Sequence, residues 1–396
     1  MPDQASANLS RRIFLIATEE SGDRLGSSLM KALRRRLGDS VRFEGVGGRS
    51  MAREGLVSLF PIEELSIMGF TAVVKQLPMI VRRVRGTADA VIAAAPDVLI
   101  IIDSPDFTHR VARRVRARCR GLPIVDYVSP SVWAWRSGRA RAMRGYVDHV
   151  LALLPFEPEA YRRLEGPPCT YVGHPLLEQV GVLRPDAQER QRRDADPPTL
   201  LVLPGSRRSE IRHHLSVFGE TIGMLRQGIP EIDVVLPTTP HFVDEITTAL
   251  ATWPRRPRVV VGEDDKRAAF RVARAALAKS GTVTLELALA GVPMIAAYKA
   301  GSVEAWIARR VIRVSSVILA NLVMRENVIP EFLQEGCVPG KLAPALREIL
   351  TDSPMRQRQL AAFARLDSIM ATGQRSPSER AADIVIEVMR ESRVRI

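Results

Sequence analysis

The sequence predicts an α/β protein built from two Rossmann-like domains, and three observations support this class. Aliphatic side chains fill consecutive positions at residues 98–102 and 200–203, as expected for strands covered on both faces of a parallel sheet. Helical stretches separate such runs in both halves of the chain, which is the pattern of βαβ units. The 396 residues also exceed what a single hydrophobic core usually holds, so we expect two domains.

The domain boundaries follow the composition. We expect an N-terminal domain over residues 1–178 and a polar, proline-rich linker over 179–198. A second domain is expected over residues 199–370. Residues 371–396 should form a C-terminal helix that packs back on the N-terminal domain.

The charge balance points to an anionic partner. The chain carries 57 Lys and Arg residues against 44 Asp and Glu residues, a net charge of +13. Such a surface suits nucleic acid, anionic lipid or a phosphorylated substrate. Aromatic residues make up only 5% and do not recur among the basic runs, which argues against a platform for single-stranded nucleic acid.

Several sequence features favour the cytoplasm. The three cysteines are scattered, which suits a reducing compartment and offers no thiolate metal site. No apolar run approaches the ~20 residues that a membrane span needs. The run at residues 13–17 is followed at once by Glu19 and Glu20, too early for a signal peptide.

The first expected strand, residues 12–17, leads into small and acidic residues. Glu19 and Asp23 should therefore lie at the carboxyl edge of a sheet, where α/β proteins usually bind ligands. A second strand at residues 41–44 is followed by Gly45, Gly47 and Gly48. These glycines fit either a loop that approaches a ligand or a tight turn.

Residues 65–85 combine many large apolar side chains with three arginines. Part of this stretch must belong to the core, but the surplus of apolar residues flanked by cations favours contact with a lipid surface. The residues expected at this surface are Ile67, Met68, Phe70, Val73, Val74 and Leu77, followed by Arg82, Arg83 and Arg85.

The strand at residues 98–102 carries the clearest site signal of the first half, because Asp103 and Asp106 follow it. Asp106 also suits the N-cap of the next helix, but capping needs only one acid. After the next strand, residues 129–136 form a polar loop that holds two tryptophans and ends at Arg136.

An anion site is expected where the strand at residues 200–203 ends at Pro204 and Gly205. Ser206 or Ser209 can cap the helix that follows, whose free N–H groups and dipole attract an anion. Arg207 and Arg208 stand beside this point and can bind phosphate. The loop lacks the spacing of a P-loop or a dinucleotide fingerprint, and it could also be an ordinary turn.

A second turn of this kind is formed by Ser280, Gly281 and Thr282. Glu286, one turn into the following helix, can accept hydrogen bonds from a ribose or can partner the helix dipole. Asn321 follows in an apolar stretch.

Six motifs, in order and over about residues 12 to 350, closely resemble those of the lipid-A-disaccharide synthase family. They are Glu19-X-Ser21-Gly22-Asp23, Asp103-Ser104-Pro105-Asp106-Phe107, Tyr127-Val128-Ser129-Pro130-Ser131-Val132-Trp133-Ala134-Trp135-Arg136, Gly173-His174-Pro175, Leu203-Pro204-Gly205-Ser206-Arg207 and Ser280-Gly281-Thr282. The resemblance implies the GT-B architecture of two Rossmann-like domains facing a central cleft. Thr18 departs from the family, which usually has glycine there.

The resemblance also implies a reaction. UDP-2,3-diacylglucosamine would donate its sugar to 2,3-diacylglucosamine 1-phosphate, giving the β-1,6-linked disaccharide 1-phosphate and UDP in one inverting displacement. Asp106 matches the family's proposed base, and Glu19 and Asp97 match its other important acids. Arg207 matches the arginine at the UDP phosphates, beside Gly205 and Ser206. Ser280, Gly281, Thr282, Glu286 and Asn321 would complete the UDP site.

Further expectations come with this reaction. No cofactor and no metal is implied, although Asp103 and Asp106 could hold one. The first domain would face the acceptor and the membrane, with Arg136 on that side, and the second would bind the donor. The enzyme would attach peripherally to the inner face of the cytoplasmic membrane, would not bind nucleic acid, and could form a homodimer.

Two other functions remain open from the residues alone. A UDP-sugar 2-epimerase would share the architecture but would need no acyl-binding surface. A basic protein that binds membrane or RNA would need no chemistry at all, but it would leave the acidic strand ends unexplained.

Overall fold

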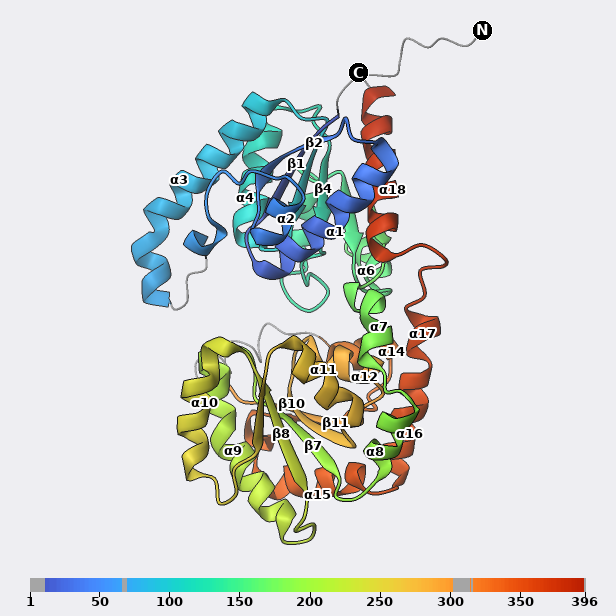
Figure 1. Ribbon diagram of the computed structural model, residues 1–396. Coiled ribbons are helices and arrows are strands. Elements are labelled where there is room, and N and C mark those ends of the chain that lie inside the picture. The colour runs from blue at the N-terminus through green and yellow to red at the C-terminus, as the bar shows by residue number, and fades with distance from the viewer. Residues whose placement is uncertain (1–10, 66–69, 302–313, 315, 395–396) are drawn as a thin grey trace. The chain divides into compact units, whose positions relative to one another are not determined.

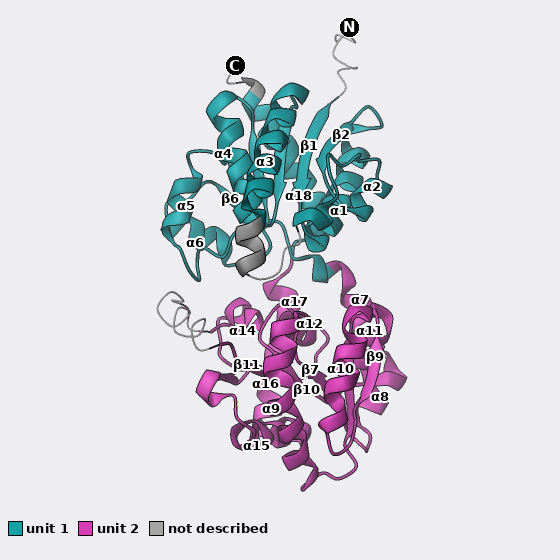
Figure 2. Cartoon of the chain, turned by 90° about the vertical axis from the view of Figure 1, so that its left-hand side faces the viewer, with its two compact units in different colours: residues 1–177, 372–396 teal, residues 178–371 magenta. Residues whose placement is uncertain are grey.

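The computed structural model describes residues 11–65, 70–301, 314 and 316–394, without the side chains of residues 70–75 and 393–394 (Figure 1). The chain divides into two compact units (Figure 2). Unit 1 holds Met1–Leu177 and Thr372–Ile396, and unit 2 holds Glu178–Ala371. Both units are α/β, so the predicted fold class is confirmed.

Unit 1 is built on a sheet of six parallel strands in the order β2-β1-β3-β4-β5-β6. The apolar runs at residues 12–17 and 98–102, predicted as strands, lie in the interior of this sheet as β1 and β3. The strands are β1 (Arg12–Ala17), β2 (Arg42–Val46), β3 (Val98–Ile102), β4 (Ile124–Tyr127), β5 (His149–Ala152) and β6 (Cys169–Tyr171). The order departs from the sequence order once, between β2 and β3, so the carboxyl ends of β1 and β3 are neighbours.

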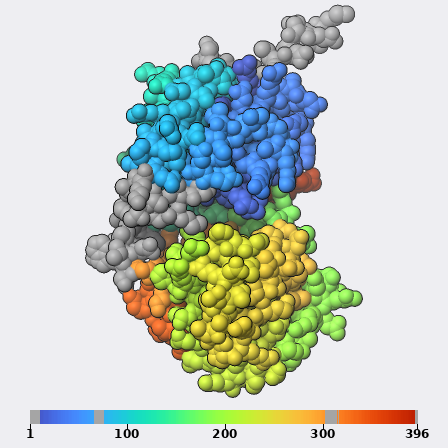
Figure 3. Space-filling view, turned by 60° about the vertical axis from the view of Figure 1, so that its left-hand side comes forward, coloured from blue at the N-terminus to red at the C-terminus, as the bar shows by residue number. Residues whose placement is uncertain are grey.

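Alternate side chains of these strands enter two separate cores. One face packs against α1 (Glu20–Leu37) and α18 (Pro377–Val394). The other packs against α3 (Phe70–Ala94) and α4 (Pro105–Arg118). The shorter elements are α2 (Arg49–Arg53), the 3-10 turn η2 (Ile62–Leu65), α5 (Gly138–Met143) and α6 (Glu157–Arg163). The atoms of α3, light blue in Figure 3, form part of the exposed face of unit 1.

The C-terminal helix belongs to unit 1 although all of unit 2 precedes it in sequence. Ala381, Val385 and Met389 of α18 are buried in the same core as the side chains of α1. Arg380 donates a hydrogen bond to the Tyr171 carbonyl at 3.0 Å, which ties α18 to the end of β6.

Unit 2 repeats the design with a second sheet of six parallel strands, in the order β12-β11-β10-β7-β8-β9. Its strands are β7 (Thr199–Leu203), β8 (Asp233–Thr238), β9 (Arg258–Val261), β10 (Ala275–Lys279), β11 (Met294–Tyr298) and β12 (Glu331–Leu333). The helices that follow β7 in this unit include α9 (Arg208–Arg226), α10 (Val243–Ala249), α11 (Glu263–Val272), α12 (Val283–Leu289), α14 (Leu319–Met324), α15 (Pro339–Leu350) and α16 (Pro354–Ala364).

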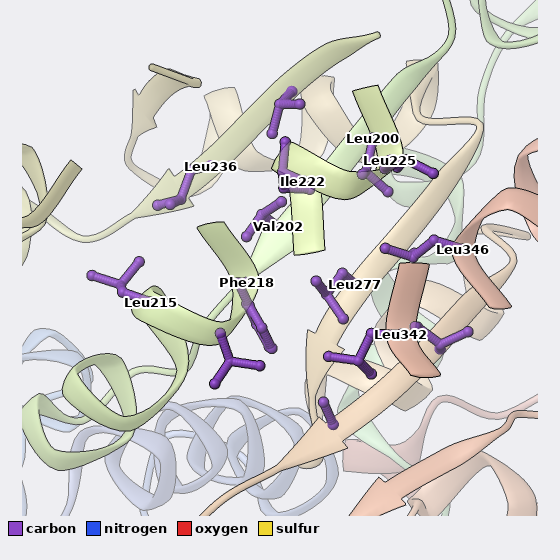
Figure 4. Packing of buried hydrophobic residues seen from close by; sticks show 14 of the residues in the cluster. Leu200, Val202, Leu215, Phe218, Ile222, Leu225, Leu236, Leu277, Leu342 and Leu346 are labelled. Carbon is purple, nitrogen blue, oxygen red and sulfur yellow. The ribbon is translucent and has the colours of Figure 1, made fainter. Parts of the chain in front are cut away.

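The core of unit 2 lies between its sheet and two helices (Figure 4). Phe218 and Ile222 of α9 and Leu342 of α15 pack over Val202 and Leu277 of the central strands. The residues expected as a linker instead form two short helices, α7 (Val180–Leu183) and α8 (Ala187–Asp194), within unit 2. Arg271 of α11 donates to Glu189 of α8 at 2.7 Å, so this stretch is packed against the domain.

Candidate functional site

Two acids meet at the carboxyl edge of the sheet in unit 1. Glu19 lies just beyond β1, and Asp103 directly follows β3, the strand that pairs with β1. The hydroxyl of Ser104 donates a hydrogen bond to Glu19 Oε1 at 3.0 Å and links the two strand ends. The parallel pairing therefore brings together residues that are 85 positions apart in sequence.

The backbone is strained where β3 turns into α4. Asp103 and Ser104 both have left-handed φ angles, 53° and 46°, which cost non-glycine residues about 1–2 kcal/mol each. Val128, which follows β4, and Arg136 also have positive φ angles. Strain of this kind gathers at functional sites because only the surrounding structure can maintain it.

The environment of Asp103 disfavours its charge. Burial raises the pKa of its carboxyl above the usual value, and the charges of Glu19 and Asp126 act in the same direction. The Ser104 N–H donates to Asp103 Oδ1 at 2.7 Å and lowers the pKa in part. Asp103 therefore braces the turn, and its surroundings favour the protonated carboxyl.

Asp106 is placed differently, as the second residue of α4. Its side chain is 85% exposed, and its one ion pair among the described residues is with Arg139, whose Nη2 lies 3.5 Å from Oδ1. Ser104, not Asp106, occupies the N-cap position. The carboxylate of Asp106 is thus free to meet a substrate.

Asp97 does not belong to this group, contrary to the expectation that it acts in catalysis. It precedes β3 and so lies at the amino edge of the sheet, a whole strand away from Asp103. At about 3.3 Å per residue the separation is roughly 20 Å. Its carboxylate accepts a hydrogen bond from Arg12 N at 2.8 Å and pairs with Arg11, so it anchors the start of β1.

Asp23 and the glycines after β2 also prove to be structural. Asp23 is buried, and its carboxylate accepts hydrogen bonds from the backbone N–H groups of Gly48, Ser50 and Met51 at 2.7–3.0 Å. A Cβ on Gly45 would lie 1.8 Å from the Leu15 carbonyl oxygen. The close approach of two strands, rather than a ligand, explains this glycine.

The tryptophan loop is held by a residue that the sequence did not reveal. Glu157 is buried at the start of α6, and it accepts hydrogen bonds from Trp133 Nε1 at 3.1 Å and from Leu154 N at 2.9 Å. Burial raises its pKa to about 7. Trp135 is exposed, and the guanidinium of Arg136 stacks on its ring at 4.4 Å.

In unit 2, a tight loop joins β7 to the start of α9. Gly205 has a φ of 125°, and a Cβ there would lie 2.6 Å from the Glu210 side chain, so only glycine fits. Arg207, not Ser206 or Ser209, occupies the N-cap position, and its side chain makes no capping bond. The Ser206 N–H instead donates to Glu210 Oε2 at 3.2 Å, which fixes the loop from within the helix.

The cations around this loop differ in how firmly they are paired. Lys279, at the end of β10, forms a 2.9 Å ion pair with Glu210 Oε1. Burial would raise the pKa of Glu210, but Lys279 and the neighbouring N–H group outweigh it, so the pKa lies below its usual value. Arg208 pairs with Glu245 at 2.8 Å, whereas Arg207 is 72% exposed and lies 3.7 Å from Glu210. Arg207 is therefore the arginine available to an anion.

The turn formed by Ser280, Gly281 and Thr282 is braced by a buried network. Ser280 Oγ donates to the Val317 carbonyl at 3.0 Å, and Val317 N donates to Glu331 Oε2 at 3.1 Å. Asn321 donates to Glu331 Oε1 and exchanges two hydrogen bonds with the backbone of Ile329. The buried amide of Asn321 is thus used by the protein, and it supports the turn instead of presenting a free group to UDP.

Glu286 is buried on α12 beside a lysine. Lys266 Nζ of α11 lies 2.9 Å from Glu286 Oε1 and 3.0 Å from Oε2, a partner that the sequence alone did not indicate. Lys266 neutralises the carboxylate while leaving lone pairs for a hydroxyl ligand. Within the described residues, no group of three or more His, Cys, Asp and Glu side chains could hold a metal ion.

The expected membrane surface is only partly visible. Ile67 and Met68 lie outside the described residues, as do the side chains of Phe70, Val73 and Val74. Leu77, on α3, is 48% exposed. Of the helices that the structure describes, none is both long and apolar enough to cross a bilayer.

Comparison with known proteins settles the family. Residues 13–385 match the family model described as lipid-A-disaccharide synthetase. The chain belongs to the lipid-A-disaccharide synthase family. It is 92% identical over 396 residues to the lipid-A-disaccharide synthase of Nitrobacter winogradskyi, with all of both chains covered. It is 43% identical to that of Rhodospirillum centenum, with 95% of this chain and 94% of the relative covered.

Solved structures share the fold at low identity. The UDP-GlcNAc 2-epimerase of Neisseria meningitidis has a TM-score of 0.59 at 10% identity, covering 96% of this chain and 100% of that one. Acinetobacter baumannii MurG has a TM-score of 0.54 at 14% identity, covering 95% and 99%. These likenesses confirm the GT-B fold, which epimerases also adopt. Membership of the synthase family makes the chain a glycosyltransferase of lipid A disaccharide formation. The two alternatives, an epimerase and a binding protein without chemistry, are therefore wrong.

Glu157 should make the protein less stable as pH rises. Its pKa is about 7 in the folded protein against 4.5 ordinarily, so between these values the folded form holds a proton that the unfolded chain releases. This stabilisation is complete below pH 4.5 and is lost as pH rises through 7. Melting temperatures from about pH 5 to pH 9 should therefore fall less steeply for Glu157→Gln than for the parent. Glu159→Gln, on the exposed face of the same helix, is the control and should follow the parent. Parallel curves for parent and Glu157→Gln would contradict the assignment.

Proposed function

We propose that the enzyme transfers the sugar of UDP-2,3-diacylglucosamine to the 6-hydroxyl of 2,3-diacylglucosamine 1-phosphate. The products are the β-1,6-linked disaccharide 1-phosphate and UDP, and the anomeric carbon is inverted in a single displacement. Family membership supports the lipid A disaccharide as product. The observation that carries the mechanism is the exposed carboxylate of Asp106 beside the strained turn at Asp103 and Ser104.

Asp106 is the general base in this proposal. A single inverting displacement needs a group that takes the proton of the acceptor hydroxyl as the oxygen attacks the anomeric carbon. Asp106 has an accessible carboxylate, and the guanidinium of Arg139 lies 3.5 Å from it. Glu19, held by Ser104, and Asp103 complete the acidic surroundings, whereas Asp97 has a structural role only.

Arg207 and the start of α9 stabilise the departing UDP. The leaving diphosphate gains negative charge as the glycosidic bond breaks, and a guanidinium with free helix N–H groups offsets it. Gly205 and Ser206 let the diphosphate approach the backbone. Ser280, Gly281 and Thr282 form the opposing turn, and Glu286 accepts hydrogen bonds from the ribose. The reaction as proposed uses no cofactor and no metal.

The substrates are lipids, so the enzyme must work at a membrane surface. The first residues of α3 provide apolar side chains, and Arg82 and Arg85 are exposed further along the helix. Such a helix can lie in the interface while its arginines meet anionic head groups. We therefore place the enzyme peripherally on the inner face of the cytoplasmic membrane.

Mass spectrometry of the products tests the reaction directly. The purified protein is incubated with both acylated substrates, and the disaccharide 1-phosphate and UDP should appear in equal amounts. The anomeric configuration of the product is read by NMR. An α-linked product would contradict inversion, and conversion of UDP-GlcNAc alone would favour the epimerase reaction.

Asp106→Asn should keep the fold and the affinity for UDP but lower kcat by roughly 100-fold or more, because the general base is lost. Asp97→Asn is the control: it should lower the melting temperature while kcat changes little, since Asp97 lies at the opposite edge of the sheet. Steady-state kinetics and calorimetry with UDP measure both effects. Near-normal turnover in Asp106→Asn would refute its role.

Arg207→Ala should weaken UDP binding and slow transfer, because a charge-assisted contact with phosphate is lost. A loss of roughly 10-fold or more in UDP affinity is expected, corresponding to about 1.5–3 kcal/mol. Arg208→Ala serves as the control, because Arg208 is already paired with Glu245 and should matter less. Equal affinities of the two variants in calorimetry would show that Arg207 has no special role.

Replacing Met68, Phe70 and Val74 together with serine should reduce binding to anionic vesicles and activity on vesicle-borne substrate. Activity in detergent micelles should fall less, and the melting temperature should change little, because an interfacial side chain does not support the core. The control replaces three exposed apolar residues of unit 2, Val182, Leu333 and Val338, with serine. If the first triple variant unfolds, or co-sediments with vesicles as well as the parent does, the three residues belong to the core.

A further inference from the structure

A fully buried carboxylate lies below the acidic cluster of unit 1. Asp126 interrupts the otherwise apolar strand β4, and its side chain has no exposed surface. It pairs in register with Ile101, so it lies two positions before Asp103 along the sheet. Neither of its oxygens accepts a hydrogen bond from the residues that the structure describes. A buried charge without a partner is strongly destabilising, so its presence calls for a compensating group.

His109 of α4 is that group. Its Nε2 lies 3.3 Å from Asp126 Oδ2, and in the described part of the chain it is the one basic side chain paired with this acid. Its Nδ1 lies 3.0 Å from the hydroxyl of Tyr146. Arg113, one turn further along α4, donates to the same hydroxyl at 3.3 Å. A carboxylate on one ring nitrogen and a hydroxyl on the other fix the orientation of an imidazole.

This pair is connected to the candidate base through a single helical turn. His109 follows Asp106 by three residues, so both lie within about one turn of α4. Val111, Ala112 and Val115 add apolar contacts between α4 and the sheet. Apolar contacts are not directional and leave the rotation of a helix weakly defined. The strained φ angles of Asp103 and Ser104 require that α4 be held firmly.

We propose that Asp126 and His109 form a positioning pair for glycosyl transfer. The pair fixes the rotation and height of α4 on the sheet, and thereby sets where the Asp106 carboxylate meets the acceptor hydroxyl. Neither residue touches the substrate. The proposal rests on the proposed role of Asp106, and it predicts that loss of the pair lowers kcat while UDP binding, which depends on unit 2, is unchanged.

Two amide substitutions of His109 separate positioning from simple stability. The amide of glutamine reaches as far as Nε2 and can contact Asp126 there, as the imidazole does, whereas the amide of asparagine reaches only as far as Nδ1. The kcat of His109→Gln should stay within roughly threefold of the parent value. The kcat of His109→Asn should fall roughly 30-fold or more, because misplacing a catalytic group by ~1 Å slows a reaction by that order. The UDP affinity and the KM for the acceptor should stay within about twofold for both variants. Asp383→Asn is the control, since Asp383 of α18 pairs with Arg36 of α1 on the opposite face of the sheet from α4 and should leave kcat unchanged.

A double variant tests the positioning role in a protein that should still fold. His109→Leu combined with Asp126→Val removes the buried charge together with its partner, a change that often preserves or raises stability. This double variant should melt near the parent temperature and still show low kcat. Parent-like kcat in the double variant, or equal kcat of His109→Gln and His109→Asn at similar melting temperatures, would overturn the positioning role. Failure of the parent itself to form the disaccharide would instead refute the proposed reaction.

Discussion

The parallel register of neighbouring strands is the constraint on which both candidate sites depend. In unit 1, Ala17 of β1 pairs with Ile102 of β3, so the next residues of both strands leave the sheet side by side. This places Glu19 within hydrogen-bond reach of Ser104. In unit 2, Leu203 of β7 pairs with Ala278 of β10, and the loop at Gly205 consequently meets Lys279. Two helices, α4 and α9, then start at these edges and present their first turns to solvent.

Polar and charged groups in and around these sites divide into two kinds by their burial. Asp106 and Arg207 are exposed and lack a close, strong partner, so they remain available to a substrate. Glu157, Glu210 and Asn321 are buried and accept or donate several hydrogen bonds within the protein. The buried groups hold the loops on which the exposed groups stand. A substitution of an exposed group should therefore change the kinetics alone. A substitution of a buried group should change the stability of the fold as well.

The turn between β3 and α4 shows how these effects combine. Two residues in left-handed conformations allow the helix to begin directly at the strand end, at a cost of about 1–2 kcal/mol each. Burial of the apolar side chains beneath α4 offsets this free-energy cost, but it does not set the rotation of the helix. Two polar contacts set the rotation of α4 instead. The Thr108 hydroxyl donates to the Asp103 carbonyl at 2.7 Å, and His109 pairs with Asp126.

The sequence by itself determined the strands, the two-domain α/β class and the motifs of the synthase family. Aliphatic runs and small or acidic residues at their ends are local signals, and strand direction then places Glu19, Asp103 and Gly205 at carboxyl edges. Asp97 could have been placed by the same rule, because it precedes its strand. Only the tertiary structure revealed Lys279 beside Glu210, Lys266 beside Glu286 and His109 beside Asp126. The two partners of each pair come from different elements, and whether they meet depends on helix rotation and strand order. Local patterns do not encode those quantities, since they are set by the packing of the whole domain.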